Sequence, residues 1–106
     1  MIRFRVVLLA VAGLGVLAAC TAPAEKVDGR AEFEARCSGC HPDGGNTINP
    51  TKTLKKMSRE ANGVVTVDDI VRKIRKPGPN MKQYDRDELP DEKAKSIAEY
   101  ILKTFN

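Results

Sequence analysis

The feature that most constrains this 106-residue chain is the run Cys37-Ser38-Gly39-Cys40-His41. Two thiols three positions apart face the same side of a helical turn, so both can react with one flat partner. The histidine that follows can turn its ring toward a metal held beside those thiols. This spacing is that of covalent c-type haem attachment, in which Cys37 and Cys40 form thioethers and His41 binds the iron.

Three other uses of this motif fit the chain less well. A thioredoxin-like Cys-Xaa-Xaa-Cys requires a βαβ setting, and no strand pattern flanks these residues. A structural zinc site requires four Cys or His ligands, whereas the chain has three Cys and one His in all. A plain disulfide between Cys37 and Cys40 leaves His41 without a role. Haem attachment in an exported protein is therefore favoured.

The N-terminus has the composition of an export signal. Arg3 and Arg5 precede an uncharged run from Val6 to Ala19, which is shorter than the about 20 residues that span a bilayer. The run ends in Leu17-Ala18-Ala19-Cys20, which resembles the bacterial lipobox. Residues 1–19 are therefore predicted to be a lipoprotein signal peptide.

The lipobox resemblance implies cleavage before Cys20 and acylation of Cys20, and two or more acyl chains give stable membrane attachment. Thr21 in place of Asp after the cysteine favours the outer membrane, by analogy with enteric bacteria. Residues 20–27 are then a lipid-anchored tether, and residues 28–106 form one folded domain. The alternative is an ordinary signal peptide, cut after an Ala-Xaa-Ala-like site, with an unused cysteine.

The charge balance does not favour a nucleic-acid partner. Of the 18 Lys and Arg residues, Arg3 and Arg5 would leave with the signal peptide, and 14 acidic residues oppose the rest. Two haem propionates would then bring the total near neutral. A domain this short has a limited core of its own, which a haem would fill as a large apolar group.

The pattern of the mature chain is helical, and no segment alternates as a strand does. Asp28 can cap a first helix, in which Phe33, Cys37 and Cys40 fall on one face. Turn residues follow His41, and a short second helix is predicted over Thr53–Ala61.

Two further helices are marked by their ends. Thr66 and Asp69 form a capping box at the start of the third, which Pro77 ends. Pro90 suits the first turn of the last helix. The apolar face of that helix carries Ala94, Ile97, Ala98, Ile101, Leu102 and Phe105. An all-α fold of about four helices is expected.

Residues outside the motif carry a family resemblance. Gly29 and Phe33 precede Cys37, and Tyr100 lies in the last helix, at the positions where class I monohaem cytochromes c pack these helices together. Asp43-Gly44-Gly45-Asn46 and the segment 49–56 are similar to stretches of the cytochrome c6 type. The resemblance covers nearly all of residues 28–105. It implies a cytochrome c domain with one covalent haem c.

The resemblance also implies the sixth iron ligand. Met81 follows a proline-rich loop and precedes the last helix, as the family's distal methionine does. The family usually has Met-Pro, whereas Lys82 stands in the proline position and Tyr84 keeps the following aromatic. Met57 is the rival, but it lies on a predicted amphipathic helix beside Leu54 and is expected to pack there.

Residues around the iron ligands are expected to orient them. A ligating histidine normally donates its other ring N–H to a carbonyl. By family resemblance the acceptor is the Pro50 carbonyl, and Asn46 orders the loop near the haem. Leu54 and Ile74 are expected to pack against the haem.

His/Met ligation implies a one-electron carrier, not an enzyme, that acts between other cytochromes or membrane redox complexes. We expect a monomer on the periplasmic side of a bacterial membrane, anchored through Cys20. Two alternatives stay open: an open-site haem protein with peroxidase or gas-sensing activity, and a fixed subunit of a larger redox complex. The absence of a second histidine in the sequence disfavours the peroxidase.

Two basic clusters are interpreted as solvated helix faces, with partner docking as the alternative. The first comprises Lys52, Lys55, Lys56 and Arg59, and the second comprises Arg72, Lys73, Arg75 and Lys76.

Overall fold

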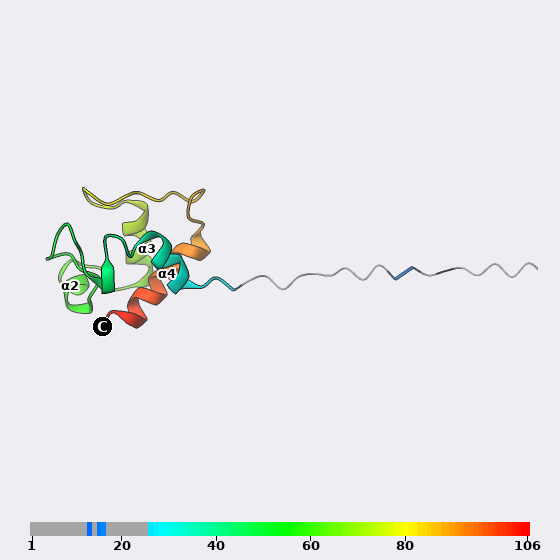
Figure 1. Cartoon of the computed structure of the whole chain (residues 1–106), viewed down its shortest axis with the longest axis horizontal. Coiled ribbons are helices and arrows are strands. Elements are labelled where there is room, and N and C mark those ends of the chain that lie inside the picture. Colours follow the sequence, from blue (N-terminus) through cyan, green and yellow to red (C-terminus); the bar gives the residue numbers. More distant parts are fainter. Residues whose placement is uncertain (1–12, 14, 17–25) are drawn as a thin grey trace, which may run out of the picture.

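The computed structural model describes residues 26–106, together with residues 13, 15 and 16. Cys20 and most of the predicted signal peptide and tether lie outside the described residues. The described chain forms the helices α1 (Gly29–Arg36), α2 (Lys56–Ala61), α3 (Val67–Arg75) and α4 (Asp91–Thr104), with a short 3-10 turn η1 at Pro42–Gly44 (Figure 1). No strand occurs between residues 26 and 106. The predicted all-α class with four helices is therefore confirmed.

Two helices begin at the caps that the sequence predicts. The Asp28 carboxylate accepts hydrogen bonds from the backbone N–H groups of Arg30 and Ala31, at 3.0 and 3.2 Å. At α3 the Thr66 hydroxyl accepts from the Asp69 N–H at 3.1 Å, and the Asp69 carboxylate accepts from the Thr66 N–H at 3.0 Å. Each pair satisfies N–H groups that have no partner within the helix.

The start of α2 differs from the prediction, because the structure begins this helix at Lys56 and not at Thr53. The Thr53 N–H donates to the Ser58 hydroxyl at 2.9 Å, and the Leu54 N–H donates to the Gly44 carbonyl at 2.7 Å. These longer-range bonds hold residues 53–55 in a non-helical conformation. Pro90 similarly lies just before α4, as its N-cap residue.

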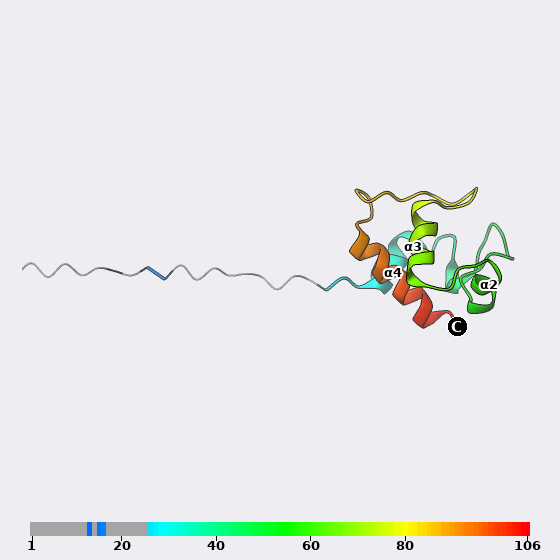
Figure 2. The same cartoon turned by 180° about the vertical axis from the view of Figure 1, so that it is seen from behind.

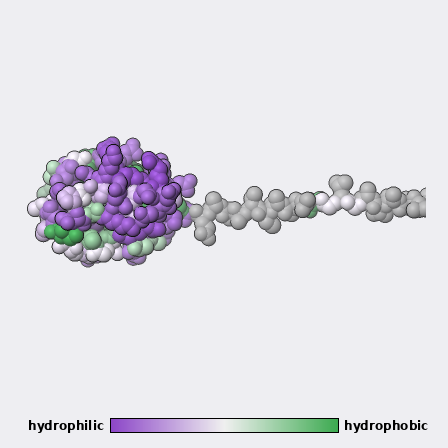
Figure 3. Space-filling model, turned by 90° about the horizontal axis from the view of Figure 1, so that it is seen from above, coloured by the Kyte–Doolittle hydropathy of each residue, from purple (hydrophilic) through white to green (hydrophobic). Residues whose placement is uncertain are grey.

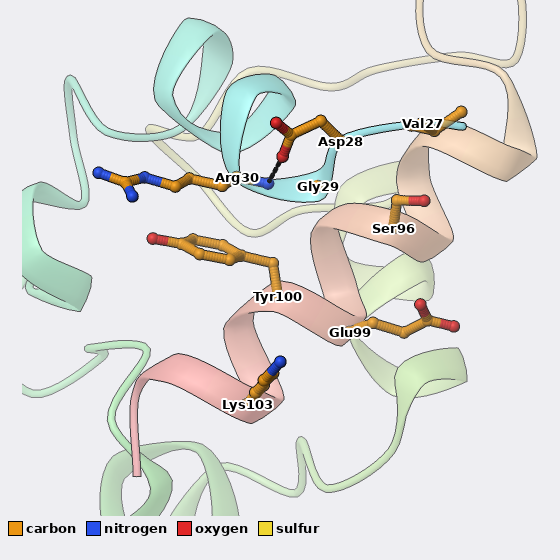
Figure 4. Close-up of a pocket in the computed structure, with 8 residues that line it drawn as sticks. All are labelled: Val27, Asp28, Gly29, Arg30, Ser96, Glu99, Tyr100 and Lys103. Atoms are coloured by element: carbon orange, nitrogen blue, oxygen red, sulfur yellow. Dashed lines mark hydrogen bonds between the residues drawn. The ribbon is translucent and has the colours of Figure 1, made fainter. Parts of the chain in front are cut away.

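The core forms where α1 and α3 pack against α4 (Figure 2). At the crossing of α1 and α4, a Cβ on Gly29 would clash with the Ser96 carbonyl and lie 3.2 Å from the Tyr100 Cβ. Figure 4 shows Gly29 beside the part of α4 that carries Ser96 and Tyr100. Only glycine allows this approach. The buried apolar residues are Phe33, Ile70, Ile74, Leu89, Ala94, Ile97, Ala98, Ile101 and Phe105.

An aromatic cluster closes the C-terminal end of the core. Phe33, Tyr100 and Phe105 lie with ring centroids 5.3 to 5.8 Å apart, in tilted and edge-on pairs. Gly44, with a φ of 77°, lies against this cluster, and a Cβ there would come within 2.5 Å of the Phe105 ring. The turn after His41 is thereby held against α4.

The surface seen in Figure 3 is mostly hydrophilic. None of the helices formed by the described residues has both the length and the apolar character needed to cross a bilayer.

Candidate haem site

Residues far apart in the sequence line one cavity of about 360 Å³. Cys37, Cys40 and His41 come from the segment after α1, and Met81 comes from the loop between α3 and α4. The apolar part of the lining includes Leu54, Val64, Ile70, Ile74, Ile97 and Ile101. A cavity of this size with apolar walls and a few polar groups is typical of a cofactor site.

The two cysteines lie on a helical turn that continues α1. The Cys37 carbonyl accepts hydrogen bonds from the N–H groups of Cys40 at 3.3 Å and His41 at 2.9 Å. Both thiols are free, with Cys37 half-buried and Cys40 exposed. Burial raises the pKa of the Cys37 thiol to about 11. Redox-active Cys-Xaa-Xaa-Cys motifs have a lowered pKa, so this site does not resemble a dithiol oxidoreductase.

A zinc site is also disfavoured. Among the described residues, no group of three or more His, Cys, Asp or Glu side chains could hold a metal ion.

The hydrogen bond of His41 corrects one prediction. Its Nδ1 lies 2.7 Å from the Gly45 carbonyl oxygen, so Gly45 and not Pro50 is the partner. The cause is η1, whose turn brings the chain back over the imidazole within four residues, while Pro50 is exposed and outside the cavity lining. A donor bond from Nδ1 leaves Nε2 free to bind iron.

Asn46 holds the loop that follows. Its amide N–H donates to the Lys52 carbonyl at 2.8 Å, and its amide oxygen accepts from the N–H groups of Ile48 at 2.9 Å and Asn49 at 2.8 Å. All four residues line the cavity. One side chain therefore bridges both ends of the loop beside the site.

The structure separates the two candidate methionine ligands. Met81 lines the cavity and is 39% exposed, next to Asn80, which has a φ of 68°. Met57 is absent from the cavity lining and is 85% exposed. The predicted packing of Met57 beside Leu54 is therefore wrong, because α2 turns this side chain to solvent.

Arg75 holds the loop that carries Met81, a role that the sequence analysis missed. Its Nη1 donates to the carbonyls of Leu89 at 2.8 Å and Tyr84 at 3.3 Å, and its Nη2 pairs with Asp91 at 2.7 Å. Its own carbonyl accepts from the Gln83 amide at 2.8 Å. The part of the loop that follows Met81 is thus fastened to α3. The sequence shows Arg75 only as a basic residue at the end of a helix. Such a residue suggests a favourable interaction with the helix dipole and nothing more.

The charged residues that line the cavity are all basic. Its lining contains the cations Arg36, Lys52, Arg59, Lys73 and Lys82, and no Asp or Glu. Arg59 is 5% exposed, which corrects its assignment to a solvated helix face.

These residues fit a haem. Two thiols can form thioethers, an imidazole and a thioether sulfur can bind iron, apolar walls can cover a porphyrin, and the cations can bind its carboxylates. The second pocket, at the α1–α4 crossing in Figure 4, is lined by no Cys, His or Met. The fold and the site together define a small all-α protein that binds one c-type haem.

Comparisons with known proteins agree. The family described as "Cytochrome C oxidase, cbb3-type, subunit III" matches residues 24–101. The chain is 38% identical over 79 residues to cytochrome c6 of Leptolyngbya boryana, covering 74% of this chain and 92% of that protein. It is 35% identical over 74 residues to cytochrome c6 of Rippkaea orientalis, covering 70% of this chain and 66% of that one.

A solved structure shows that the likeness extends to the fold. OmcF, described as outer membrane cytochrome F from Geobacter sulfurreducens, is 45% identical and superposes with a TM-score of 0.72, covering 74% of this chain and 99% of OmcF. The chain belongs to the class I monohaem cytochromes c and is similar to cytochrome c6 and OmcF. Membership of this family confirms the predicted class of function, an electron carrier and not an enzyme, and the predicted cofactor, one covalent haem c.

Proposed function

We propose that this protein is a lipid-anchored, one-electron carrier whose haem iron is bound by His41 and Met81. The observation that carries the ligation is the shared cavity: both side chains line it, together with Cys37 and Cys40. Met57, the other methionine of the domain, does not line it.

A haem bound by histidine and methionine can carry one electron without help from any other catalytic residue. A bound haem supplies reversible one-electron transfer, and methionine ligation raises its reduction potential. The chain's own residues orient the ligands: Gly45 holds the His41 ring, and Arg75 fastens the loop of Met81. Neither ligand has to leave during transfer, so the protein's task is to hold and bury the cofactor and to dock its partners.

The proposed location is the outer membrane, with the domain on the periplasmic side and the anchor at Cys20. The lipobox-like run before Cys20 supports the anchor, and the printed description of OmcF as an outer membrane cytochrome supports the membrane. Labelling with a radioactive fatty acid tests the anchor. Label is expected in the wild-type chain and absent from Cys20→Ala.

A second candidate is a fixed subunit of a larger redox complex. The description of the matching family, subunit III of a cytochrome oxidase, favours it. Gentle solubilisation followed by size-exclusion chromatography separates the two. A free monomer supports the carrier, and stoichiometric co-migration with other redox subunits supports the fixed subunit.

The ligation is tested by the absorption spectrum of the oxidised holoprotein. Methionine bound to Fe(III) gives a weak charge-transfer band at the red edge. The band is expected in the wild type and in the control Met57→Ala, and is expected to vanish in Met81→Ala. A wild-type protein without the band would instead support the open-site alternative, and a band that survives in Met81→Ala would remove Met81 from the site.

A further inference from the structure

The chain on the two sides of Met81 is restrained in different ways. Pro77 and Pro79 precede Met81, and each proline ring fixes its own backbone φ. Asn80, directly before Met81, has a left-handed φ of 68°. After Met81 the next proline is Pro90, so this side of the loop depends on contacts between residues.

Tyr84 is a fixed point three residues after Met81. Its N–H donates to the Ile74 carbonyl at 3.2 Å, and its hydroxyl donates to the Arg36 carbonyl at the end of α1 at 3.3 Å. Its own carbonyl accepts from Arg75 at 3.3 Å. Tyr84 is thus joined to both α1 and α3.

Lys82 connects Met81 to this fixed part of the loop. Its ammonium lies 4.8 Å from the centroid of the Tyr84 ring and 2.8 Å from a carboxylate oxygen of Glu88. Both contacts attract a cation. Glu88 is itself held in a turn, because its N–H donates to the Asp85 carboxylate at 2.8 Å. One side chain beside the proposed iron ligand therefore makes two contacts with residues that are already held.

Other lysines near the cavity lack this combination. Lys52 and Lys73 are exposed and line the cavity, but no ion pair between described residues includes either of them. Lys55 lies 5.2 Å from the centroid of the Phe105 ring, which is not part of the loop. Within the part of the chain that the structure describes, Lys82 alone combines an ion pair with a contact to an aromatic ring.

We propose that Lys82 is a positioning residue that keeps Met81 on the haem iron by holding its loop against Tyr84 and Glu88. The inference rests on the proposed ligation of the iron by Met81. A detachment of Met81 that moves residue 82 away from the loop breaks both contacts. Each exposed contact of these kinds shifts an equilibrium by up to about fivefold. Loss of the Lys82 ammonium should therefore raise the fraction of molecules with Met81 detached by about threefold or more.

Imidazole binding to the oxidised holoprotein measures this fraction. Imidazole takes the iron position that Met81 leaves, so its apparent dissociation constant falls as the detached fraction rises. We expect Lys82→Gln to bind imidazole about threefold or more tightly than wild type. Lys82→Arg should bind it as wild type does, because a guanidinium also pairs with a carboxylate and stacks on an aromatic ring. Lys95→Gln is the control and should match wild type, since Lys95 is exposed and outside the cavity lining.

Glu88→Gln separates positioning from a direct effect of Lys82 on imidazole, because Glu88 lies outside the cavity lining. This variant removes the ion pair alone and should tighten imidazole binding about twofold. The double variant Lys82→Gln/Glu88→Gln should match Lys82→Gln, since changes to two partners of one interaction do not add. An affinity in Lys82→Gln equal to that of wild type overturns the inference, and so does an affinity in Glu88→Gln equal to that of wild type.

The red-edge band separates failure of this inference from failure of the proposed ligation. A wild type without the band overturns Met81 ligation and the inference with it. A wild type that has the band, and whose imidazole affinity is unchanged by Lys82→Gln, overturns the inference alone.

Discussion

At the scale of single residues, Gly29 decides how closely α1 and α4 approach. A Cβ at this position would clash with the Ser96 carbonyl, which belongs to backbone and cannot rotate away. We expect Gly29→Ala to lower the free energy of unfolding by about 1–3 kcal/mol, as overpacking does. Denaturant unfolding of the holoprotein measures this. Gly39→Ala is the control, because its added Cβ has no atom within 4 Å apart from the adjoining residues of the chain. Equal losses in both variants would contradict the explanation.

Arg75 is expected to stabilise the ligand loop. Arg75→Gln removes charged hydrogen bonds to the Leu89 and Tyr84 carbonyls and should cost about 2 kcal/mol. The red-edge band should then disappear at lower denaturant concentration than in wild type. Arg86→Gln is the control, because it also loses an ion pair to Asp91. The Arg86 side chain is 74% exposed, so its replacement should lower the free energy of unfolding by less than about 1 kcal/mol. If both variants lose the band at the same denaturant concentration, the hydrogen bonds of Arg75 are not what holds the loop.

The sequence predicts which residues share a site where a short motif brings them together. Cys37, Cys40 and His41 belong to one five-residue motif, and all three line the cavity. The Gly45 acceptor, the exposure of Met57 and the burial of Arg59 depend on tertiary contacts. Charged side chains are usually exposed. Only the fold shows that the Arg59 guanidinium is buried and donates to the carbonyls of Leu54 and Phe105.

At the scale of elements, the capping box of α3 makes a prediction about stability. Thr66→Ala removes the hydroxyl that accepts from the Asp69 N–H, and should cost about 1 kcal/mol. Thermal unfolding of the holoprotein measures the loss. Thr104→Ala, at the last residue of α4, is the control and should have little effect. A loss at Thr104 as large as at Thr66 would contradict the capping account.

The same cap predicts a response to acid. Hydrogen bonds from the N–H groups of Thr66 and Val65 lower the pKa of Asp69 from 3.8 to about 2. Since the folded-state pKa is depressed, this carboxylate stabilises the fold fully above the unfolded value, and the contribution is lost as pH falls through about 2. The free energy of unfolding of Asp69→Asn should therefore depend less on pH below 3.8 than that of wild type. The same pH dependence below 3.8 in both proteins would contradict this assignment.

Helix ends were predictable where a local cap exists, and not elsewhere. Asp28 and Thr66 act within three residues of their own positions, so sequence patterns detect them. The start of α2 depends on the bond between the Leu54 N–H and the Gly44 carbonyl, a contact across ten positions. Periodicity does not encode such a contact.

At the scale of the whole molecule, the cations at the cavity predict electrostatic steering. Lys52 and Lys73 are exposed beside the site, where an acidic redox partner would approach. Electron-transfer rates with such a partner should fall about tenfold or more as ionic strength rises, because salt screens the attraction. Stopped-flow kinetics measure this fall. The double variant Lys52→Gln/Lys73→Gln should weaken the dependence of the rate on ionic strength. The control Lys103→Gln, which lies outside the cavity lining, should keep the wild-type dependence. A wild-type rate that does not change with ionic strength would exclude steering.

Extraction of the purified, exported protein with acid acetone tests whether the haem is covalently attached. Covalent attachment means a porphyrin bonded through sulfur to Cys37 and Cys40, which line the cavity. We expect the red colour to stay with the precipitated chain, whose mass exceeds that of the polypeptide and its Cys20 acyl groups by one haem. A colourless protein, or pigment that passes into the acetone, would contradict it.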